Sequence, residues 1–231
     1  MISERVSIPV GDKGQVSGVL SVEADRQFAE RTGVILAHGA GNDMEHPLLV
    51  SLSQGLADAG YITLRFNFLY REKGLKSPDA QNTLVLAWQS ACRFLGEHTR
   101  YGTDMIIAAG KSMGGRVASQ MVADGLLPVS RLVFLGYPLH PPGNKEKLRD
   151  AHLYRIKIPM LFFVGTRDRL CDLGKLKGVL GRLEADWDLK TIEGGDHSFR
   201  LPKSVSITRQ DVDDRILNKT SEWLATHAER R

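Results

Sequence analysis

The sequence has little cysteine and no cysteine pattern typical of a metal site. Its two cysteines, Cys92 and Cys171, do not form the close paired spacings that bind zinc. The start of the chain has no basic segment followed by an apolar stretch, so we expect no secretory signal peptide. We therefore expect a cytoplasmic protein whose thiols are reduced, with Cys92 buried on the apolar face of a helix.

Long hydrophobic runs are also missing. No apolar stretch approaches the roughly 20 residues that a membrane-spanning helix requires. Charge is not concentrated in one sign, because 31 Lys and Arg residues against 27 Asp and Glu residues give a net charge of +4, spread along the chain. We therefore expect a small-molecule substrate, with no nucleic acid and no membrane as partner. The composition does not indicate an oligomeric state.

The sequence does contain a regular alternation of strand-like and helix-like segments. Its 231 residues, 42% of them hydrophobic, suit one domain spanning residues 1–231. Short apolar runs typical of strands buried on both faces occupy residues 33–37, 61–66, 105–109, 131–136 and 159–165. Further strands are expected within residues 5–24 and 187–192. The alternation predicts an α/β fold, a three-layer α/β/α sandwich with a mostly parallel central sheet.

Helical patterns fill the intervals between these strands. Apolar residues three or four apart predict helices near residues 49–59, 84–95, 113–121 and 173–183. Residues 77–79 (Ser-Pro-Asp) have the residue types of a helix start, so residues 67–76 are expected to form a loop. Thr208 and Asp211 resemble a capping box that opens a last helix.

A Gly-x-Ser-x-Gly motif lies between the apolar run at 105–109 and a helical pattern. Gly110, Ser112 and Gly114 match the turn that presents a nucleophilic serine between a strand and a helix. The turn is so tight that bulky neighbours of the serine would clash, and glycine removes the offending Cβ atoms. The helix that follows directs its first N–H groups at the serine, which favours negative charge there. The motif therefore predicts Ser112 as a nucleophile.

A serine nucleophile needs a base that accepts its proton and an acid that orients the base. Asp168 follows the strand predicted at 159–165, and His197 follows the strand predicted at 187–192. Both would reach the carboxyl edge of the sheet, where ligands bind in such folds. The order serine, aspartate, histidine matches the order expected with this motif. We predict Ser112, Asp168 and His197 as catalytic residues, and we expect Asp196 to make a local turn bond instead.

The other histidines compete less well for the role of base. His140 follows a strand and is the main rival, although its proline-rich surroundings favour an ordinary loop. His38 also ends a strand, and we expect it to support the backbone near the site. The remaining histidines are expected at the surface: His46, His98, His152 and His227.

An acyl-transfer site also needs N–H donors for an oxyanion. The motif assigns one donor to Met113, the residue after the nucleophile, and a second to the glycine-rich loop after the run at 33–37. In that loop Ala40 is the first choice and Gly41 the next.

Four residues are possible substrate contacts by their position at strand ends: Gly41, Asn67, Tyr70 and Arg71. Equally, the aromatic residues could belong to the core and the arginines to surface ion pairs. Lys111, beside the nucleophile, either lends positive potential to an anionic substrate or packs and reaches solvent.

With these motifs in place, the chain resembles the α/β-hydrolase superfamily over nearly its whole length. It looks most like a branch of small dienelactone-hydrolase-like proteins, which includes relatives of the hydrolase-like domain in a eukaryotic histone-acetyltransferase complex subunit. The resembling stretches are residues 38–44, 64–68, 110–116 and 194–199. By resemblance, Ser112 is the nucleophile, Asp168 the acid and His197 the base. Because dienelactone hydrolases carry a cysteine nucleophile, we do not expect dienelactone hydrolysis here.

The short segment between the strands at 131–136 and 159–165 leaves no room for a lid domain. We therefore expect a carboxylic ester hydrolase with an open site, acting on small soluble esters or thioesters through an acyl-enzyme, without a metal or an organic cofactor. Two alternatives stay open. One is a catalytically silent interaction module that keeps the fold, and the other is an acyltransferase that passes the acyl group to an alcohol or to peroxide.

Overall fold

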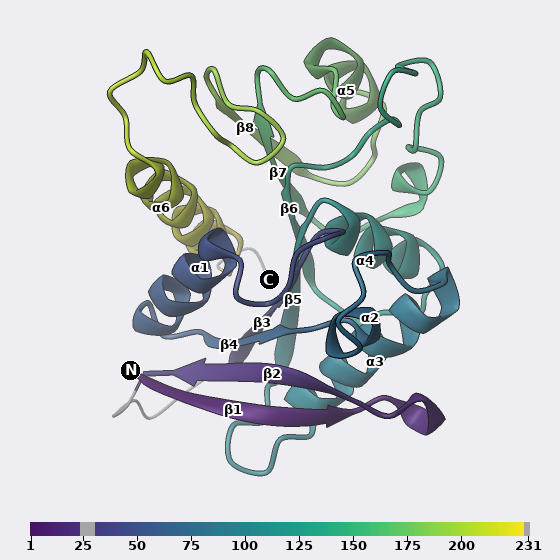
Figure 1. Ribbon diagram of the computed structural model, residues 1–231, viewed down its shortest axis with the longest axis vertical. Helices are drawn as coiled ribbons and strands as arrows, with labels where there is room; N and C mark the ends of the chain where they lie inside the picture. Colours follow the sequence, from purple (N-terminus) through teal and green to yellow (C-terminus); the bar gives the residue numbers. More distant parts are fainter. Residues whose placement is uncertain (24–30, 229–231) are drawn as a thin grey trace.

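An eight-stranded sheet runs through the centre of the molecule (Figure 1). The computed structural model describes residues 1–23 and 31–228. The strands are β1 Ile2–Pro9, β2 Gln15–Val22, β3 Thr32–Ala37, β4 Ile62–Phe66, β5 Met105–Lys111, β6 Arg131–Leu135, β7 Met160–Gly165 and β8 Trp187–Ile192. Their order across the sheet is β1-β2-β4-β3-β5-β6-β7-β8. β2 runs antiparallel to β1 and β4, and all other pairs are parallel, so the predicted mostly parallel sheet is confirmed.

Helices cover both faces of this sheet and give the predicted three layers (Figure 1). On one face α1 (Pro47–Asp58) packs against α6 (Arg209–Ala228). The other face carries α2 (Leu69–Glu72), α3 (Gln81–Gly96), α4 (Met113–Ala123) and α5 (Leu173–Leu180). None of the helices within the described residues is long and apolar enough to cross a membrane.

The connection from β6 to β7 is short, as the sequence predicts. Over residues 136–159 the chain forms one 3₁₀ turn, Leu153–Arg155, and no lid domain. A second 3₁₀ turn, Gly11–Lys13, joins β1 to β2.

The central strands are mainly apolar because each of them faces two cores. In β5, Ile106 and Ala108 belong to the core under α3, α4 and α5, whereas Ile107 and Ala109 belong to the core under α1 and α6. This follows from the strand geometry, in which successive side chains point to opposite faces. A sheet covered on both sides therefore needs continuous apolar runs, which is the pattern that the sequence contains.

The larger core also supports the start of α4. Trp88 of α3 is fully buried, and its ring meets that of Phe66 edge-on at 5.4 Å. Its indole Nε1 donates a hydrogen bond of 3.2 Å to the backbone carbonyl of Gly114, in the first turn of α4. The side chain that fills the core thus also fixes the turn carrying Ser112.

Two local expectations are wrong. The stretch 67–76, expected to be a loop, contains the short helix α2, and α3 begins at Gln81 instead of at residues 77–79. The reason is that the carboxylate of Asp79 accepts a 2.9 Å hydrogen bond from the backbone N–H of Tyr70, so it caps α2. The capping box at α6 is confirmed, since Thr208 N donates to the carboxylate of Asp211 at 2.7 Å and Asp211 N donates to Thr208 Oγ1 at 3.2 Å.

Candidate active site

Ser112 stands on a strained turn between β5 and α4. Its φ of 48° and ψ of −112° lie in a region that residues with a Cβ rarely adopt. The turn is closed by backbone packing: a Cβ on Gly110 would lie 2.2 Å from the backbone nitrogen of Gly115, and one on Gly114 would lie 2.7 Å from the carbonyl oxygen of Ala37. The motif glycines are therefore required by contact between backbones.

The structure brings the three predicted catalytic side chains together. The Ser112 hydroxyl and His197 Nε2 are 2.8 Å apart, and His197 Nδ1 lies 2.8 Å from the Asp168 carboxylate. The Asp168 side chain is completely buried, and its other oxygen accepts a 2.7 Å bond from the backbone N–H of Leu170. Because the carboxylate can only accept, Nδ1 carries the imidazole proton and leaves Nε2 free to take the serine proton.

Asp196, next to the histidine, makes the local turn bonds that the sequence suggests. Its carboxylate accepts hydrogen bonds from the backbone N–H groups of Ser198, at 2.7 Å, and Arg200, at 2.9 Å. The turn also contains Phe199, whose φ of 61° is strained. These bonds hold the loop in the conformation that presents His197 to Ser112.

The rival histidine, His140, is engaged elsewhere. Its Nε2 accepts a 3.1 Å hydrogen bond from the backbone N–H of Asp172, which ties two loops together. Of the four histidines expected at the surface, His152 is buried, whereas His46, His98 and His227 are half-buried. His152 is buried between the hydroxyls of Ser119 and Tyr137, at 2.8 and 3.1 Å, and burial lowers its pKa to about 4. Burial also lowers the pKa of His46 to about 4, and the cations around it add to the effect.

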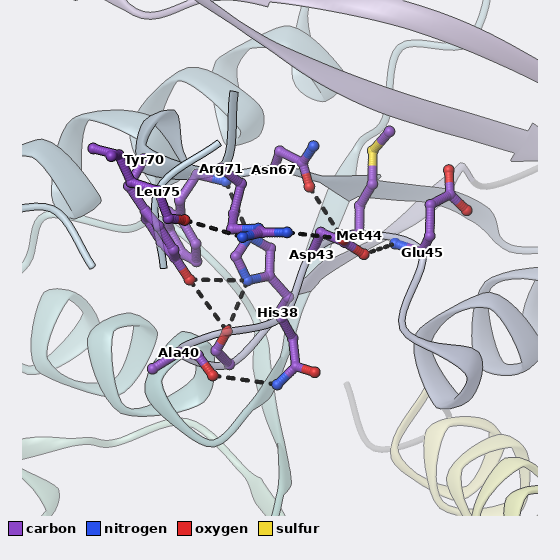
Figure 2. Close-up of polar contacts among 12 residues, drawn as sticks. His38, Ala40, Asp43, Met44, Glu45, Asn67, Tyr70, Arg71 and Leu75 are labelled. Atoms are coloured by element: carbon purple, nitrogen blue, oxygen red, sulfur yellow. Dashed lines mark hydrogen bonds and ion pairs between the residues drawn. The ribbon is translucent and has the colours of Figure 1, made fainter. Parts of the chain in front are cut away.

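His38 supports the backbone of the glycine-rich loop, as expected (Figure 2). Its Nε2 accepts a 3.1 Å hydrogen bond from the backbone N–H of Phe68, so Nδ1 must carry the proton. Nδ1 then donates to the carbonyl oxygen of Gly39 at 2.8 Å, and the hydroxyl of Tyr70 donates to the same oxygen at 3.3 Å. Burial lowers the pKa of His38 to about 4, so the ring is neutral.

These bonds orient the peptide between Gly39 and Ala40. The peptide is planar and trans, so the N–H of Ala40 points away from the side that His38 and Tyr70 occupy. The loop also lies beside the nucleophile, because a Cβ on Gly39 would stand 3.3 Å from the Cβ of Ser112. Met113 is the first residue of α4, where N–H groups have no partner within the helix. Both expected oxyanion donors therefore belong to segments adjoining Ser112.

Three of the four possible substrate contacts hold the protein together. Asn67 accepts a 2.8 Å hydrogen bond from the backbone N–H of Met44, and Arg71 binds the carboxylate of Asp43 at 3.3 Å (Figure 2). Tyr70 is buried against Gly39, as described above. The fourth residue, Gly41, is exposed and has a φ of 73°. Of the two alternatives, substrate contact or structural support, the contacts of Asn67, Tyr70 and Arg71 favour structural support of the loop that follows β3.

Lys111 is buried beside the nucleophile, an arrangement that the sequence does not reveal. Its ammonium donates a 3.0 Å hydrogen bond to the backbone carbonyl of His197 and lies 5.5 Å from the centre of the Phe199 ring. Burial, assisted by the charges of Arg209 and Arg200 and opposed by those of Asp168 and Asp196, lowers its pKa to about 8. Lys111 therefore holds the loop that carries the histidine.

We expect the free energy of unfolding to reflect the buried ammonium of Lys111. Between pH about 8 and the ordinary lysine value of 10.5, the unfolded chain keeps a proton that the folded protein has lost, so stability rises with pH. Lys111→Met removes this dependence. The stability of the native protein relative to this variant should increase by on the order of 1–3 kcal/mol across that interval in urea titrations. A flat difference, like that expected for Lys147→Met at an exposed position, would contradict the assignment.

The carboxyl end of β7 packs directly on the backbone of the histidine loop. A Cβ on Gly165 would stand 2.2 Å from the carbonyl oxygen of Gly195 and 2.5 Å from that of Asp196. We expect Gly165→Ala to destabilise the protein by about 1–3 kcal/mol, measured as a lower urea midpoint. Gly178→Ala is the matched control, because Gly178 lies in α5 with open space around it and should not lose stability. Equal midpoints for the two variants would disprove the contact.

No group of three His, Cys, Asp or Glu side chains able to hold a metal ion occurs within residues 1–23 and 31–228.

An open, mostly parallel sheet with a strained serine after one strand and an acid and a histidine after later strands defines the α/β-hydrolase class. Solved structures with the same fold include a dienelactone hydrolase from Anabaena variabilis, with a TM-score of 0.73 and 22% identity over 97% of each chain. An α/β serine hydrolase without a lid from Xanthomonas campestris has a TM-score of 0.72 and 17% identity, covering 96% of this chain and 94% of that one. An α/β serine hydrolase homologue from Coxiella burnetii has a TM-score of 0.73 and 19% identity, covering 95% of this chain and 98% of that one.

The sequence itself identifies the family. The profile of the alpha/beta hydrolase domain family matches residues 30–225, which is most of the chain. The chain therefore belongs to this family, and its solved neighbours include dienelactone-hydrolase-like members.

Proposed function

We propose that the protein is a serine hydrolase that cleaves small soluble carboxylic esters or thioesters through an acyl-enzyme. The observation that carries the proposal is the unbroken hydrogen-bond chain from the Ser112 hydroxyl through His197 to the buried Asp168 carboxylate. Such a chain activates a hydroxyl that is otherwise a poor nucleophile. The family membership and the esterase-like fold agree with this chemistry.

In the proposed reaction, His197 Nε2 removes the proton of Ser112 as the serine oxygen attacks the substrate carbonyl. The backbone N–H groups of Met113 and Ala40 stabilise the negative charge on the carbonyl oxygen. The tetrahedral intermediate collapses, and the imidazolium of His197 protonates the departing alcohol or thiol. A water molecule then gives a proton to His197 as its oxygen attacks the acyl group. The bond to the serine oxygen breaks, the acid leaves, and His197 returns the proton to Ser112. Asp168 remains ionised and stabilises the imidazolium in both halves.

Residues 136–159 form no lid domain over the site, and this open access suits small soluble substrates. An open site does not exclude water from the acyl-enzyme, and this favours hydrolysis over transfer to another acceptor. We propose a small molecule as partner, no cofactor, and action in the cytoplasm, where the buried thiols of Cys92 and Cys171 would stay reduced.

A fluorophosphonate probe tests the proposal, because it reacts with an activated serine and adds a fixed mass. We expect one adduct per chain, located at Ser112 by peptide mapping and lost in His197→Ala. His140→Ala is the control, since His140 binds a different loop. Folded protein that forms no adduct would refute the proposal and favour an interaction module that retains the fold without the activity.

A further inference from the structure

A cavity of about 390 Å³ borders the candidate active site. His197 forms part of its wall, and three arginines reach into it from two loops: Arg167 and Arg169 on either side of Asp168, and Arg200 three residues after the histidine. The volume lies in the range of small-molecule sites. The cavity adjoins the candidate active site through His197, whose Nε2 is 2.8 Å from the Ser112 oxygen.

The three guanidinium groups have no partner in the described part of the protein. Neither an ion pair nor a side-chain hydrogen bond engages Arg167, Arg169 or Arg200 within residues 1–23 and 31–228. Other arginines near the same edge of the sheet are paired: Arg65 with Glu45 and Arg71 with Asp43. Three neighbouring cations without counter-charges repel one another, and an anion placed between them would relieve this repulsion.

The single acid that lines the cavity does not neutralise it. Asp196 accepts the two backbone hydrogen bonds that shape the histidine loop with one carboxylate oxygen, Oδ1. One carboxylate against three guanidinium groups leaves the lining with a net positive charge. Arg200 also acts on the site itself, since its charge contributes to the lowered pKa values of Lys111 and His46.

The backbones that carry these arginines are fixed to each other. The N–H of Arg167 donates a 2.8 Å hydrogen bond to the carbonyl of Gly195, which joins the loop after β7 to the loop after β8. The carbonyl of Arg200 accepts a 3.1 Å bond from Asp196 N, and its N–H is held by the Asp196 carboxylate. The backbone positions from which Arg167 and Arg200 extend are thus set before a ligand binds, which lowers the cost of ordering the two loops.

We propose that Arg167, Arg169 and Arg200 bind an anionic group of the substrate, a carboxylate or a phosphate, so that the ester or thioester beside it reaches Ser112. This inference rests on the proposed hydrolase function and specifies its substrate class. Guanidinium groups suit the role because their planar fork of donors matches carboxylate and phosphate oxygens. The positive field would also draw anionic substrates to the site, an effect that salt weakens.

Matched substrates test the proposal, with 4-acetoxybenzoate compared with neutral 4-acetoxybenzamide. We expect the native protein to prefer the anionic ester by about 10-fold or more in kcat/KM at low salt, which corresponds to the interaction of charges near a protein surface. The preference should fall toward 1 in the triple variant Arg167→Gln, Arg169→Gln, Arg200→Gln and decrease as salt is added. The ratio cancels any general loss of activity that the substitutions cause.

Two further pairs locate and identify the anion. A mono-aryl succinate against its succinamate places the charge in the acyl part, and 4-acetoxyphenyl phosphate replaces the carboxylate of the first pair by a phosphate.

Arg93→Gln is the matched control for Arg200→Gln, because Arg93 lies near the end of α3, by the opposite edge of the sheet. It should leave the preference unchanged, whereas Arg200→Lys should retain part of it because it keeps the charge.

The inference fails if the native protein turns over the charged and neutral members of all pairs equally, or if the triple variant keeps the native preference. Binding of 4-acetoxybenzoate to Ser112→Ala separates this failure from that of the hydrolase proposal. If fluorophosphonate does not react and no ester is cleaved, the hydrolase proposal is wrong. Calorimetry on Ser112→Ala then still decides whether the cavity binds the anion and whether the triple arginine change removes that binding.

Discussion

Replacing Ser112 by alanine is expected to lower kcat/KM for an activated ester such as 4-nitrophenyl acetate by about 10³-fold or more. The substitution removes the only atom that can form the acyl-enzyme, and His197 then has no hydroxyl to deprotonate. The residual rate enhancement would come from the oxyanion donors and from substrate binding. The hydrogen-bonded side chains of serine, histidine and aspartate act as a unit, so losing one removes the contribution of all three.

The measurement needs steady-state kinetics and a demonstration that the variant is folded. Ser204→Ala is a suitable control because Ser204 is exposed in the loop before α6. Equal urea midpoints for the native protein and Ser112→Ala would exclude unfolding as the cause. Turnover within a few-fold of native by the pure Ser112→Ala protein would show that the observed hydrolysis comes from elsewhere and would overturn the mechanism.

Asp168→Asn is expected to reduce kcat by about 10⁴-fold while leaving the fold intact. The asparagine amide can donate to His197 Nδ1, which favours the tautomer with its proton on Nε2. That nitrogen then faces the Ser112 hydroxyl as a donor and cannot accept its proton. Asparagine has nearly the same shape as aspartate. The decrease in kcat therefore reports the change of the His197 tautomer and the loss of the negative charge.

Asp172→Asn provides the matched control, four residues further along. Asp172 caps α5 by accepting a 3.1 Å hydrogen bond from Lys175 N, and asparagine can accept the same bond. Asp172→Asn should therefore retain its activity. An Asp168→Asn protein that keeps more than about a tenth of the native kcat would mean that another group orients His197.

The sequence is sufficient to predict that the side chains of Ser112, Asp168 and His197 come together, because their signals are local. Ser112 is marked by its glycines, while Asp168 and His197 each follow an apolar strand, and the order of strands along the chain brings their carboxyl ends to one edge. The mostly parallel sheet follows from the same alternation. These predictions depend on neighbours within a few residues, where side-chain chemistry and backbone geometry are directly coupled.

The residues that the sequence does not reveal depend on distant partners. Lys111 is buried because it binds the His197 carbonyl, 86 positions away, and His152 is buried by Ser119 on α4. Asp79 has the residue type of a cap for the helix that follows, but it caps α2 instead. In each case the polar group is satisfied by a segment that propensity and periodicity do not identify. The unpaired arginines of the cavity are likewise recognisable only in the structure, which shows which other arginines form ion pairs with acidic residues.

The order of strands has a consequence for how the protein reaches its active form. The 2.8 Å bond between Ser112 and His197 closes a span of 85 residues, and the strands that precede Asp168 and His197 must first pair in register. Contacts of such long range form late, because the loop entropy must be lost before they stabilise the chain. Helix α4 joins residues close together along the chain, and helix formation itself takes about a microsecond or less. During refolding, the circular dichroism signal of the helices should therefore recover before Ser112 becomes reactive toward the fluorophosphonate probe. The rate at which that reactivity returns would report the last step of folding.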